Sequence, residues 1–395
     1  MSTIKIKDNV HWIGVKDPGL RVFDVIMSTE KGTTYNSYLI DDEKVAIIDA
    51  VKTGFYEEYI KNIKEVIGDR KVDYIIVNHT ELDHSGSLKE LIEEYPEATV
   101  YGSKPAIMYL KNIVNGDFTS HTVADGETLS LGKRTLKFIS APFLHWPDTM
   151  FEYSEFDKIL FTCDAFGSHY CSENMFDDEA GDFSYEFKYY FDVIMGPFKK
   201  HVLTAMDKIE DLDMDMICTS HGPILRTDPK KRIPLYRKWS QSALKTREEK
   251  VVSIFYVTAY NNTEHMAEVL KDTVEKAGFK TNLFNITSKE ISELVDMIEN
   301  SDALLIGSPT INQDALKPVW DLLSQVSPIT NRGKIGGAFG SYGWSGEAVG
   351  MINQRLKSLK FRVVDEGIRV NFVPSDKDIE DIVSYGNKVV EALNK

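Results

Sequence analysis

The chain has 395 residues, of which 42% are hydrophobic and 27% are charged; a single core rarely grows to this length, so we expect two domains. The formal net charge of −15 reflects 46 Lys and Arg against 61 Asp and Glu, and such a surface disfavours binding to nucleic acid or to an anionic membrane. No apolar run approaches the roughly 18–20 residues that span a bilayer, and Cys163, Cys171 and Cys218 form no CxxC motif, which favours a soluble protein of the reducing cytoplasm.

The first part of the chain consists of short apolar segments separated by loops rich in His, Asp and Glu. The expected strands include Lys44–Asp49, Asp73–Asn78, Thr135–Ser140 and Lys158–Thr162. The polar segment Arg237–Lys250 is expected to form a helix and a linker. We therefore predict one domain at residues 1–248 and a second at residues 249–395.

A dense set of potential metal ligands follows the expected strand Asp73–Asn78. His79, Glu81, Asp83 and His84 supply four ligands within six residues. In an extended loop, side chains two residues apart point the same way, so we expect the first three of these residues to converge and His84 to follow at the turn. A solvated loop does not require such a concentration of ligands, and the sequence therefore predicts a metal site.

Three further candidate ligands, His145, Asp164 and His221, stand next to strands later in the chain. Each of them alone would more often be a capping, packing or hydrogen-bonding residue. Together with the first four they supply seven nitrogen and oxygen ligands. That number is enough for two metals that share one bridging carboxylate.

After about residue 250, strands and helices alternate regularly, which implies a doubly wound parallel sheet. The expected strands are Val251–Val257, Lys280–Ile286, Ala303–Ser308, Lys334–Gly340 and Phe361–Val364. The expected helices are Glu264–Ala277, Glu290–Asn300, Ala315–Gln325, one after Gly346 and a last one from Lys377.

Three loops at the ends of these strands indicate a flavin site, because ligands of open α/β sheets bind at the carboxyl ends of the strands. Hydroxyl and backbone N–H groups at a helix N-terminus cradle a phosphate, and an aromatic side chain can flank a flat ring. The candidate residues are Thr258, Ala259, Tyr260, Asn261, Asn262 and Thr263, then Ser308, Pro309, Thr310, Ile311 and Asn312, then Ser341, Tyr342, Gly343, Trp344 and Gly346. No GxGxxG motif with a downstream acidic residue occurs, so NAD(P) binding is not expected.

The order of the metal-ligand motifs resembles the metallo-β-lactamase fold, an αββα sandwich. Glu81 stands where zinc hydrolases of that fold usually carry the second histidine of His-x-His-x-Asp-His. A carboxylate there adds negative charge and hard oxygen donation, which favours iron but leaves zinc and manganese open. This half, followed by a flavodoxin-like half, resembles the flavodiiron proteins (A-type flavoproteins) over essentially the whole chain, as do the segments GTTYNSYLI, HTELDHSGS, DAFG and GSYGWSG.

The resemblance implies an oxidoreductase that reduces dioxygen to water, nitric oxide to nitrous oxide, or both, at a non-haem di-iron site with electrons relayed through FMN. It implies that one iron is held by His79, Glu81 and His145 and the other by Asp83, His84 and His221, with Asp164 as the bridge. Trp146 is implied to lie near the flavin ring, and Tyr190 to act as a hydrogen-bond donor outside the ligand set. Asp24 stands where many members of the family have a pocket histidine.

The resemblance also implies a head-to-tail homodimer, alone or as a dimer of dimers. The electron donor is expected to be a separate protein or cofactor, rubredoxin first and a reduced deazaflavin as the alternative. Two other classes stay open: a zinc hydrolase of the metallo-β-lactamase fold fused to a flavodoxin-like electron-transfer module, and a non-catalytic flavin carrier. The remaining histidines, His11, His121, His169, His201 and His265, are expected to be surface or packing residues.

Overall fold

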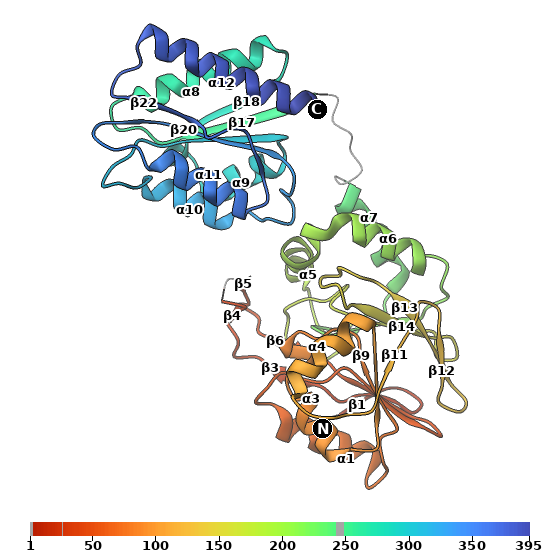
Figure 1. Cartoon of the computed structure of the whole chain (residues 1–395). Helices are drawn as coiled ribbons and strands as arrows, with labels where there is room; N and C mark the ends of the chain where they lie inside the picture. Colours follow the sequence, from red (N-terminus) through yellow and green to blue (C-terminus); the bar gives the residue numbers. More distant parts are fainter. Residues whose placement is uncertain (1–2, 26, 242–248) are drawn as a thin grey trace. The chain divides into compact units, whose positions relative to one another are not determined.

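The computed structural model describes residues 3–25, 27–241 and 249–395. The chain forms two compact units, Met1–Lys245 and Thr246–Lys395 (Figure 1). The predicted domain boundary after residue 248 falls at the edge of the segment 242–248, outside the described residues, and stays a prediction. Among the residues described, none of the helices has both the length and the apolar character required to cross a bilayer.

The N-terminal unit is built on two main sheets. The first has seven strands in the order β1 (Ile4–Lys7), β2 (Val10–Trp12), β7 (Tyr38–Asp41), β8 (Val45–Ile48), β9 (Tyr74–Val77), β10 (Thr99–Gly102) and β11 (Ser120–Thr122). The second has five strands in the order β12 (Thr128–Ser130), β13 (Thr135–Ser140), β14 (Met150–Ser154), β15 (Ile159–Cys163) and β16 (Met216–Thr219). Two small sheets pair β3 (Val15–Asp17) with β6 (Thr33–Tyr35), and β4 (Val22–Phe23) with β5 (Met27–Ser28).

The N-terminal unit has four layers, with two sheets packed face to face between two layers of helices. The strand β8 shows how these layers meet. On β8, Ala46 and Ile48 belong to the apolar cluster shared by the two sheets, whereas Val45 and Ile47 belong to the cluster that packs under the helices. Because both faces of this strand are buried, it reads as a continuous apolar run. The helical segments are α1 (Tyr56–Ile67), α2 (Leu82–Ser85), α3 (Leu88–Glu94), α4 (Lys104–Val114), α5 (Ser184–Tyr190), a π-helical turn η1 (Phe191–Met195), η2 (Gly196–Phe198), α6 (Lys199–Ile209), η3 (Pro229–Lys231) and α7 (Arg232–Ser240).

The predicted αββα sandwich is confirmed, with one correction at its end. The helix expected within Arg237–Lys250 begins earlier, since α7 starts at Arg232 and ends at Ser240. Tyr236 and Trp239 of this helix pack on Phe191, with ring centroids 4.9 Å from the Phe191 ring in both cases. The helix α7 is therefore part of the N-terminal core. The polar residues of Arg237–Lys250 give no indication of this burial. The rest of the predicted linker reaches residues outside those described.

The C-terminal unit is a single parallel sheet covered by helices on both faces. Its strand order is β18 (Lys280–Asn285), β17 (Val251–Tyr256), β19 (Ala303–Gly307), β20 (Ile335–Tyr342) and β21 (Arg362–Val363), with β22 (Ile368–Asn371) also paired to β20. Its helices are α8 (Asn262–Lys276), η5 (Ile286–Ser288), α9 (Ile291–Glu299), α10 (Lys317–Gln325), α11 (Ala348–Ser358) and α12 (Asp376–Asn394). Figure 1 shows α8 and α12 on one face of the sheet and α9, α10 and α11 on the other. This is the predicted doubly wound, flavodoxin-like sheet.

Candidate metal centre and flavin site

The seven predicted metal ligands come from the loops and the helical turn at the ends of strands. His79 and Glu81 follow β9, His145 precedes β14, Asp164 follows β15 and His221 follows β16. The expectation of an extended loop through His79–Asp83, with the turn only at His84, is wrong at Asp83. Residues Leu82–Ser85 form the helical turn α2, which gives Asp83 and His84 a direction different from that of the residues before them.

As a result, the ligands divide into two clusters. His79, Glu81, His145 and Asp164 offer ligand atoms that all lie within 4.8 Å of one another, and so do Asp83, His84 and His221. A third set, His84, Cys163 and Asp164, overlaps with these two. The structure therefore brings all seven predicted residues together, in two neighbouring groups that match the division implied by the family resemblance.

Asp164 faces both clusters with different oxygen atoms. Its Oδ2 atom lies 3.4 Å from Nε2 of His145 and 3.6 Å from Nε2 of His79. Its Oδ1 atom lies 3.1 Å from Nε2 of His84 and 3.6 Å from Nε2 of His221. This is the arrangement that a carboxylate bridging two metals requires.

Several residues outside the ligand set hold the ligands in place, and the sequence reasoning assigned a role to only one of them, Tyr190. Its hydroxyl donates to Oδ1 of Asp164 over 2.9 Å, and the hydroxyl of Ser220 donates to the same oxygen over 2.8 Å. Both carboxylate oxygens of Asp148 lie 3.3 Å from Nδ1 of His79. Asp148 stands three residues after the predicted ligand His145, and this closeness in sequence is the signal that could identify it.

In the first cluster, each charged side chain changes the pKa of its neighbours. Burial alone would lower the pKa of His79, but hydrogen bonds to Asp148 and Glu81 outweigh burial and raise the pKa to about 10. Burial would raise the pKa of Glu81, but hydrogen bonds from His145 and His79 outweigh it and lower that pKa below its usual range. A cluster in which histidines hold protons this strongly carries excess negative charge and attracts cations.

The second cluster contains buried polar atoms that make no hydrogen bond, although two of them lie close to other ligand atoms. Nε2 of His84 is 3.1 Å from Oδ1 of Asp164, and Oδ2 of Asp83 is 3.0 Å from Nε2 of His221. Within the described part of the chain, both ring nitrogens of His84 and both carboxylate oxygens of Asp83 lack a hydrogen bond. Buried polar atoms are normally paired, because an unpaired one costs about 1–3 kcal/mol. A metal ion pairs such atoms, and imidazole with carboxylate is a donor set that non-haem iron uses. The residues present therefore fit a two-metal centre.

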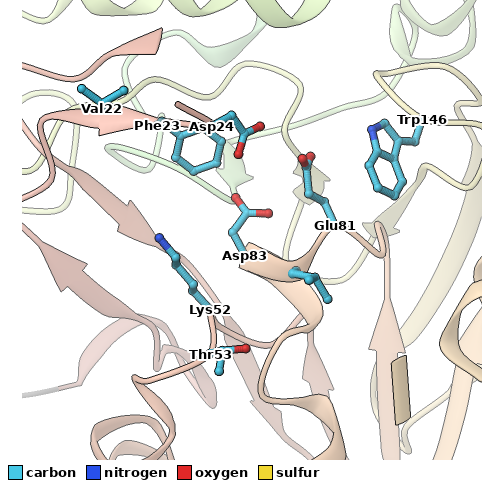
Figure 2. Close-up of a pocket in the computed structure, with 9 residues that line it drawn as sticks. Val22, Phe23, Asp24, Lys52, Thr53, Glu81, Asp83 and Trp146 are labelled. Atoms are coloured by element: carbon cyan, nitrogen blue, oxygen red, sulfur yellow. The ribbon is translucent and has the colours of Figure 1, made fainter. Parts of the chain in front are cut away.

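A cavity of about 410 Å³ opens onto both clusters. Figure 2 shows the carboxylates of Asp24, Glu81 and Asp83 turned toward a common space, with Lys52 near them and Trp146 at the far side. Asp24 thus lies in the pocket, as expected. Burial first, and then the charges of Glu81 and Asp83, raise the pKa of Asp24 to about 6.

The three predicted flavin loops meet at one edge of the C-terminal sheet. The hydroxyls of Thr263 and Ser341 lie 3.0 Å apart, and the Thr310 N–H donates to the Ser341 carbonyl over 3.0 Å. The Ala348 N–H at the start of α11 donates to the Thr310 hydroxyl over 3.3 Å. The loops are therefore joined by direct hydrogen bonds. Their edge also includes Asn371, at the end of a strand that the sequence did not predict.

The first of these loops is shaped to receive an anion. The Oγ1 atom of Thr258 has no hydrogen bond among the described residues, although it is buried. Asn261 adopts a left-handed conformation with φ 61°, directly before α8 begins at Asn262, so the loop turns sharply into the helix. Backbone N–H groups at such a helix N-terminus and an unpartnered hydroxyl fit a phosphate. The exposed rings of Tyr260 and Trp344 lie in the loops beside it.

Comparison with known families supports both units. A family model described as ODP family beta lactamase matches residues 33–222, and a flavodoxin model matches residues 254–386. The flavo-diiron protein FprA2 of Clostridium acetobutylicum is 42% identical over 405 residues, which covers 100% of this chain and 100% of that protein. The type A flavoprotein fprA of Rhodobacter capsulatus is 41% identical over 397 residues, covering 99% of this chain and 91% of that protein. A nitric oxide reductase of Moorella thermoacetica is 37% identical, covering 99% and 98%.

Solved structures of similar proteins also extend through both units. The rubredoxin oxygen:oxidoreductase of the anaerobe Desulfovibrio gigas superposes with a TM-score of 0.67 at 30% identity, covering 99% of this chain and 98% of that chain. The flavodiiron protein of Giardia intestinalis superposes with a TM-score of 0.66 at 33% identity, covering 100% and 98%. The predicted fold and order of units are confirmed.

Proposed function

This chain belongs to the flavodiiron protein (type A flavoprotein) family, and on that premise we propose that it reduces dioxygen to water, nitric oxide to nitrous oxide, or both. It is an oxidoreductase whose cofactors are FMN and a di-iron centre. The observation that carries the proposal is the position of Asp164, whose two oxygens face two separate groups of histidine and carboxylate ligands. Two-metal hydrolases can also share a bridging carboxylate, so this chain is separated from them by the carboxylate of Glu81 in the ligand set and by the flavodoxin-like unit.

In this proposal, the clusters correspond to the two irons. His79, Glu81 and His145 hold one, Asp83, His84 and His221 hold the other, and Asp164 bridges them. Two contacts support the assignment of the histidine ligands: Asp148 lies against Nδ1 of His79, and the carbonyl oxygen of Thr34 lies 2.6 Å from Nδ1 of His221. Such contacts leave the Nε2 lone pairs free to bind metal.

When bound, the iron pair and FMN supply the electrons, two from the ferrous ions and two from the reduced flavin. Four electrons and four protons convert dioxygen into two waters, and two electrons with two protons convert two nitric oxides into nitrous oxide and water. The protein must admit a small apolar gas and hold it between the clusters. The cavity wall provides apolar surface from Phe23, Leu82 and Trp146, with Asp24 and Lys52 as polar groups that can hold water.

The bridging carboxylate is oriented by the protein itself. Hydroxyl groups of Tyr190 and Ser220 donate to the same oxygen of Asp164, and Tyr190 is buried at 3% exposure. Burial would raise the pKa of Asp164, but the charge of His84 and hydrogen bonds with His145 and His84 lower it well below its ordinary value. The two hydroxyl donors fix the plane of this carboxylate. The role of these two residues is therefore to hold the bridge in one orientation while substrate binds and product leaves.

FMN is proposed to bind along the edge formed by the three loops of the C-terminal unit. The residues at 258–263 would receive its phosphate, and those at 308–312 and 341–346 its ring system, with Trp146 near the ring. We propose that Trp146 of one copy of the chain meets the flavin of another copy. Tyr260, Trp344 and Phe372 are 86%, 80% and 63% exposed, and exposed aromatic groups next to a cofactor site mark an interaction surface. A head-to-tail homodimer, alone or as a dimer of dimers, accounts for both features.

Electrons are proposed to come from rubredoxin, since the similar Desulfovibrio gigas protein is a rubredoxin oxygen:oxidoreductase; a reduced deazaflavin is the alternative. We also propose a cytoplasmic location. The three cysteines are free, as expected of a protein in a reducing compartment.

The experiment that tests the function is anaerobic reduction of protein loaded with iron and FMN, followed by matched turnover with dioxygen and with nitric oxide. Consumption of either gas, with water or nitrous oxide as the product, supports the proposal. The ratio of the two rates gives the substrate preference. Failure to consume either gas by protein with full iron and FMN contradicts it.

A further inference from the structure

His169 is a buried histidine that belongs to neither ligand cluster. Its side chain is 4% exposed, and its ring centroid lies 4.9 Å from that of His221. Its Nδ1 atom lies 2.9 Å from Oγ1 of Thr33. We propose that His169 acts through the Thr33 hydroxyl as a positioning residue that sets how strongly His221 donates to its metal. This inference rests on the proposed function, since it assigns His221 to one of the irons.

The protonation of His221 follows from its contacts. Its Nδ1 atom lies 2.6 Å from the carbonyl oxygen of Thr34, and a carbonyl oxygen can only accept a hydrogen bond. The proton of neutral His221 is therefore on Nδ1. Its Nε2 atom, 3.0 Å from Oδ2 of Asp83, keeps the lone pair on the side of the ligand cluster. This Nδ1–H bond fixes the tautomer and strengthens the donor atom at the opposite side of the ring.

The Thr33 hydroxyl lies within reach of three partners. Its Oγ1 is 2.9 Å from Nδ1 of His169, 3.3 Å from Nδ1 of His221 and 3.4 Å from the carbonyl oxygen of Thr34. Because His221 carries its proton on Nδ1, the Thr33 oxygen accepts there. Its own proton has two possible acceptors, and the imidazole of His169 is the nearer one. We assign the proton of neutral His169 to Nε2, so that its Nδ1 accepts from the Thr33 hydroxyl and draws this proton away from the carbonyl that already accepts from His221.

The other nitrogen of His169 shows that the imidazole is not there for packing alone. Its Nε2 atom has no hydrogen bond among the described residues, and a buried unpaired polar atom is unfavourable. The ring packs on Phe23, with centroids 4.5 Å apart, and on Tyr190, with centroids 4.9 Å apart. Phenylalanine would make these aromatic contacts without an unpaired nitrogen. The feature that only histidine supplies is the acceptor at Nδ1.

The predicted effect is on the reduction potential of the iron, which sets the equilibrium between its ferrous and ferric states. When His169 takes the Thr33 hydroxyl proton, the Thr34 carbonyl accepts only from His221. The Thr33 oxygen is then a second, more distant acceptor for the same Nδ1–H group of His221. A more electron-rich imidazole stabilises a ferric ion more than a ferrous ion, because the ferric ion has the higher charge. Removing the acceptor on His169, or the hydroxyl of Thr33, should therefore raise the reduction potential of the iron pair.

The test measures the reduction potential of the iron pair in wild-type protein and in His169→Phe, Thr33→Val and the double variant. The potential is followed by the electron paramagnetic resonance signal of the half-reduced pair, with iron content and thermal midpoint measured on the same samples. Each single variant should raise the potential by the equivalent of a roughly three- to tenfold change in the ferric/ferrous equilibrium, where tenfold is about 59 mV for one electron. The double variant should shift no further than one single variant, since both act on one pathway.

Two more variants separate positioning from packing. The side-chain oxygen of Asn lies near the position of Nδ1 and can accept from Thr33, so His169→Asn should restore most of the wild-type potential. Gln places its polar group near the position of Nε2, so His169→Gln should behave like His169→Phe. His121→Phe, at a histidine that pairs with Glu127 away from the ligands, is the matched control and should leave the potential unchanged.

An unchanged potential in both single variants with full iron overturns the inference, and so does an equal shift in the Asn and Phe variants. Thr33→Val keeps the test decisive if His169→Phe does not fold. A wild-type protein that binds no redox-active iron pair overturns the proposed function itself. The two failures are therefore distinguishable.

Discussion

The hydroxyl of Tyr190 donates a hydrogen bond to Oδ1 of Asp164 over a distance of 2.9 Å. Tyr190 is the last residue of α5, and the π-helical turn η1 begins at the next residue, Phe191. A π-helical turn inserts a residue into the helical repeat and is frequent at functional sites. Here the π-helical turn begins directly after Tyr190, the residue whose hydroxyl donates to the candidate bridging carboxylate.

The first prediction concerns this contact. Tyr190→Phe removes the hydroxyl and leaves the ring in place, so Asp164 keeps only the donor from Ser220. Because hydrogen bonds from outside the ligand set typically change metal affinity or activity by about 10- to 100-fold, we expect a loss of gas-reduction rate in that range. Steady-state turnover and iron content are measured on the same preparation. A rate equal to that of wild type would show that Tyr190 has only a packing role.

The second prediction concerns Asp148. This carboxylate accepts from the backbone N–H and the hydroxyl of Thr80, each over 2.7 Å, and lies against Nδ1 of His79. Asp148→Asn keeps the shape but weakens the hold on His79, so the affinity of one of the two metal sites should fall by about 10- to 100-fold. Competition with a chelator measures it, and one iron should be lost before the other. Simultaneous loss of both irons, or of neither, would contradict the assignment of His79 to one cluster.

The third prediction concerns FMN. Thr258 carries a buried hydroxyl that has no hydrogen-bond partner within the described residues. If it donates to the phosphate, Thr258→Val should weaken FMN binding by about 1.5–3 kcal/mol, the contribution of a hydrogen bond to a charged group. Titration of flavin-free protein with FMN, followed by fluorescence quenching, gives the affinity. Iron content should not change, and Thr287→Val on η5 is a control that should leave both unchanged.

The fourth prediction concerns stability. Glu152, on β14, is fully buried, and its carboxylate has no well-formed hydrogen bond among the described residues, only a contact with the Asn78 side chain that opposes the rise of its pKa. Burial first, and then the charge of Asp49, raise the pKa of Glu152 well above its ordinary value. The folded protein therefore keeps a proton that the unfolded chain releases near pH 4.3. The stabilising contribution is complete below that pH and is lost as the pH rises toward the folded pKa.

Glu152→Gln removes this dependence, since a glutamine does not titrate. Between pH 5 and pH 7, the free energy of unfolding of the wild type should fall relative to that of the variant by up to about 1.4 kcal/mol per pH unit. Urea unfolding at several pH values, followed in the transition of the N-terminal unit, measures the difference. A constant difference across this range would mean that Glu152 has the same protonation in both states.

The fold and the ligand set could be predicted because their signals are local. Seven ligand-type residues follow or precede apolar strands, and the alternation of strands and helices after residue 250 is regular. The division of the ligands into two clusters is implied by the family resemblance but could not be predicted from the spacing of the ligands. The turn α2, only four residues long, separates Asp83 and His84 from Glu81, and the pattern of residues two apart gives no sign of it.

The residues that hold the ligands are harder to predict than the ligands. Thr33 and Thr34 are 188 and 187 residues from His221 in sequence, so only the pairing of distant loops brings them together. His169 lies in no recognisable motif, so the sequence predicts only a surface or packing role for it. The strand β22 is short, with mixed burial, and its register on β20 depends on tertiary contacts. Long-range pairing, and not composition, decides each of these cases.

Gas reduction by this protein should require two irons joined by Asp164. The most direct measurement is the rate of dioxygen and nitric oxide consumption by FMN-loaded, reduced protein as iron is added to the metal-free form, with zinc as the parallel addition. We expect little turnover up to the first iron, full turnover at two irons per chain, and none with zinc. Turnover that follows FMN content alone, or that is equal with zinc and iron, would contradict this expectation.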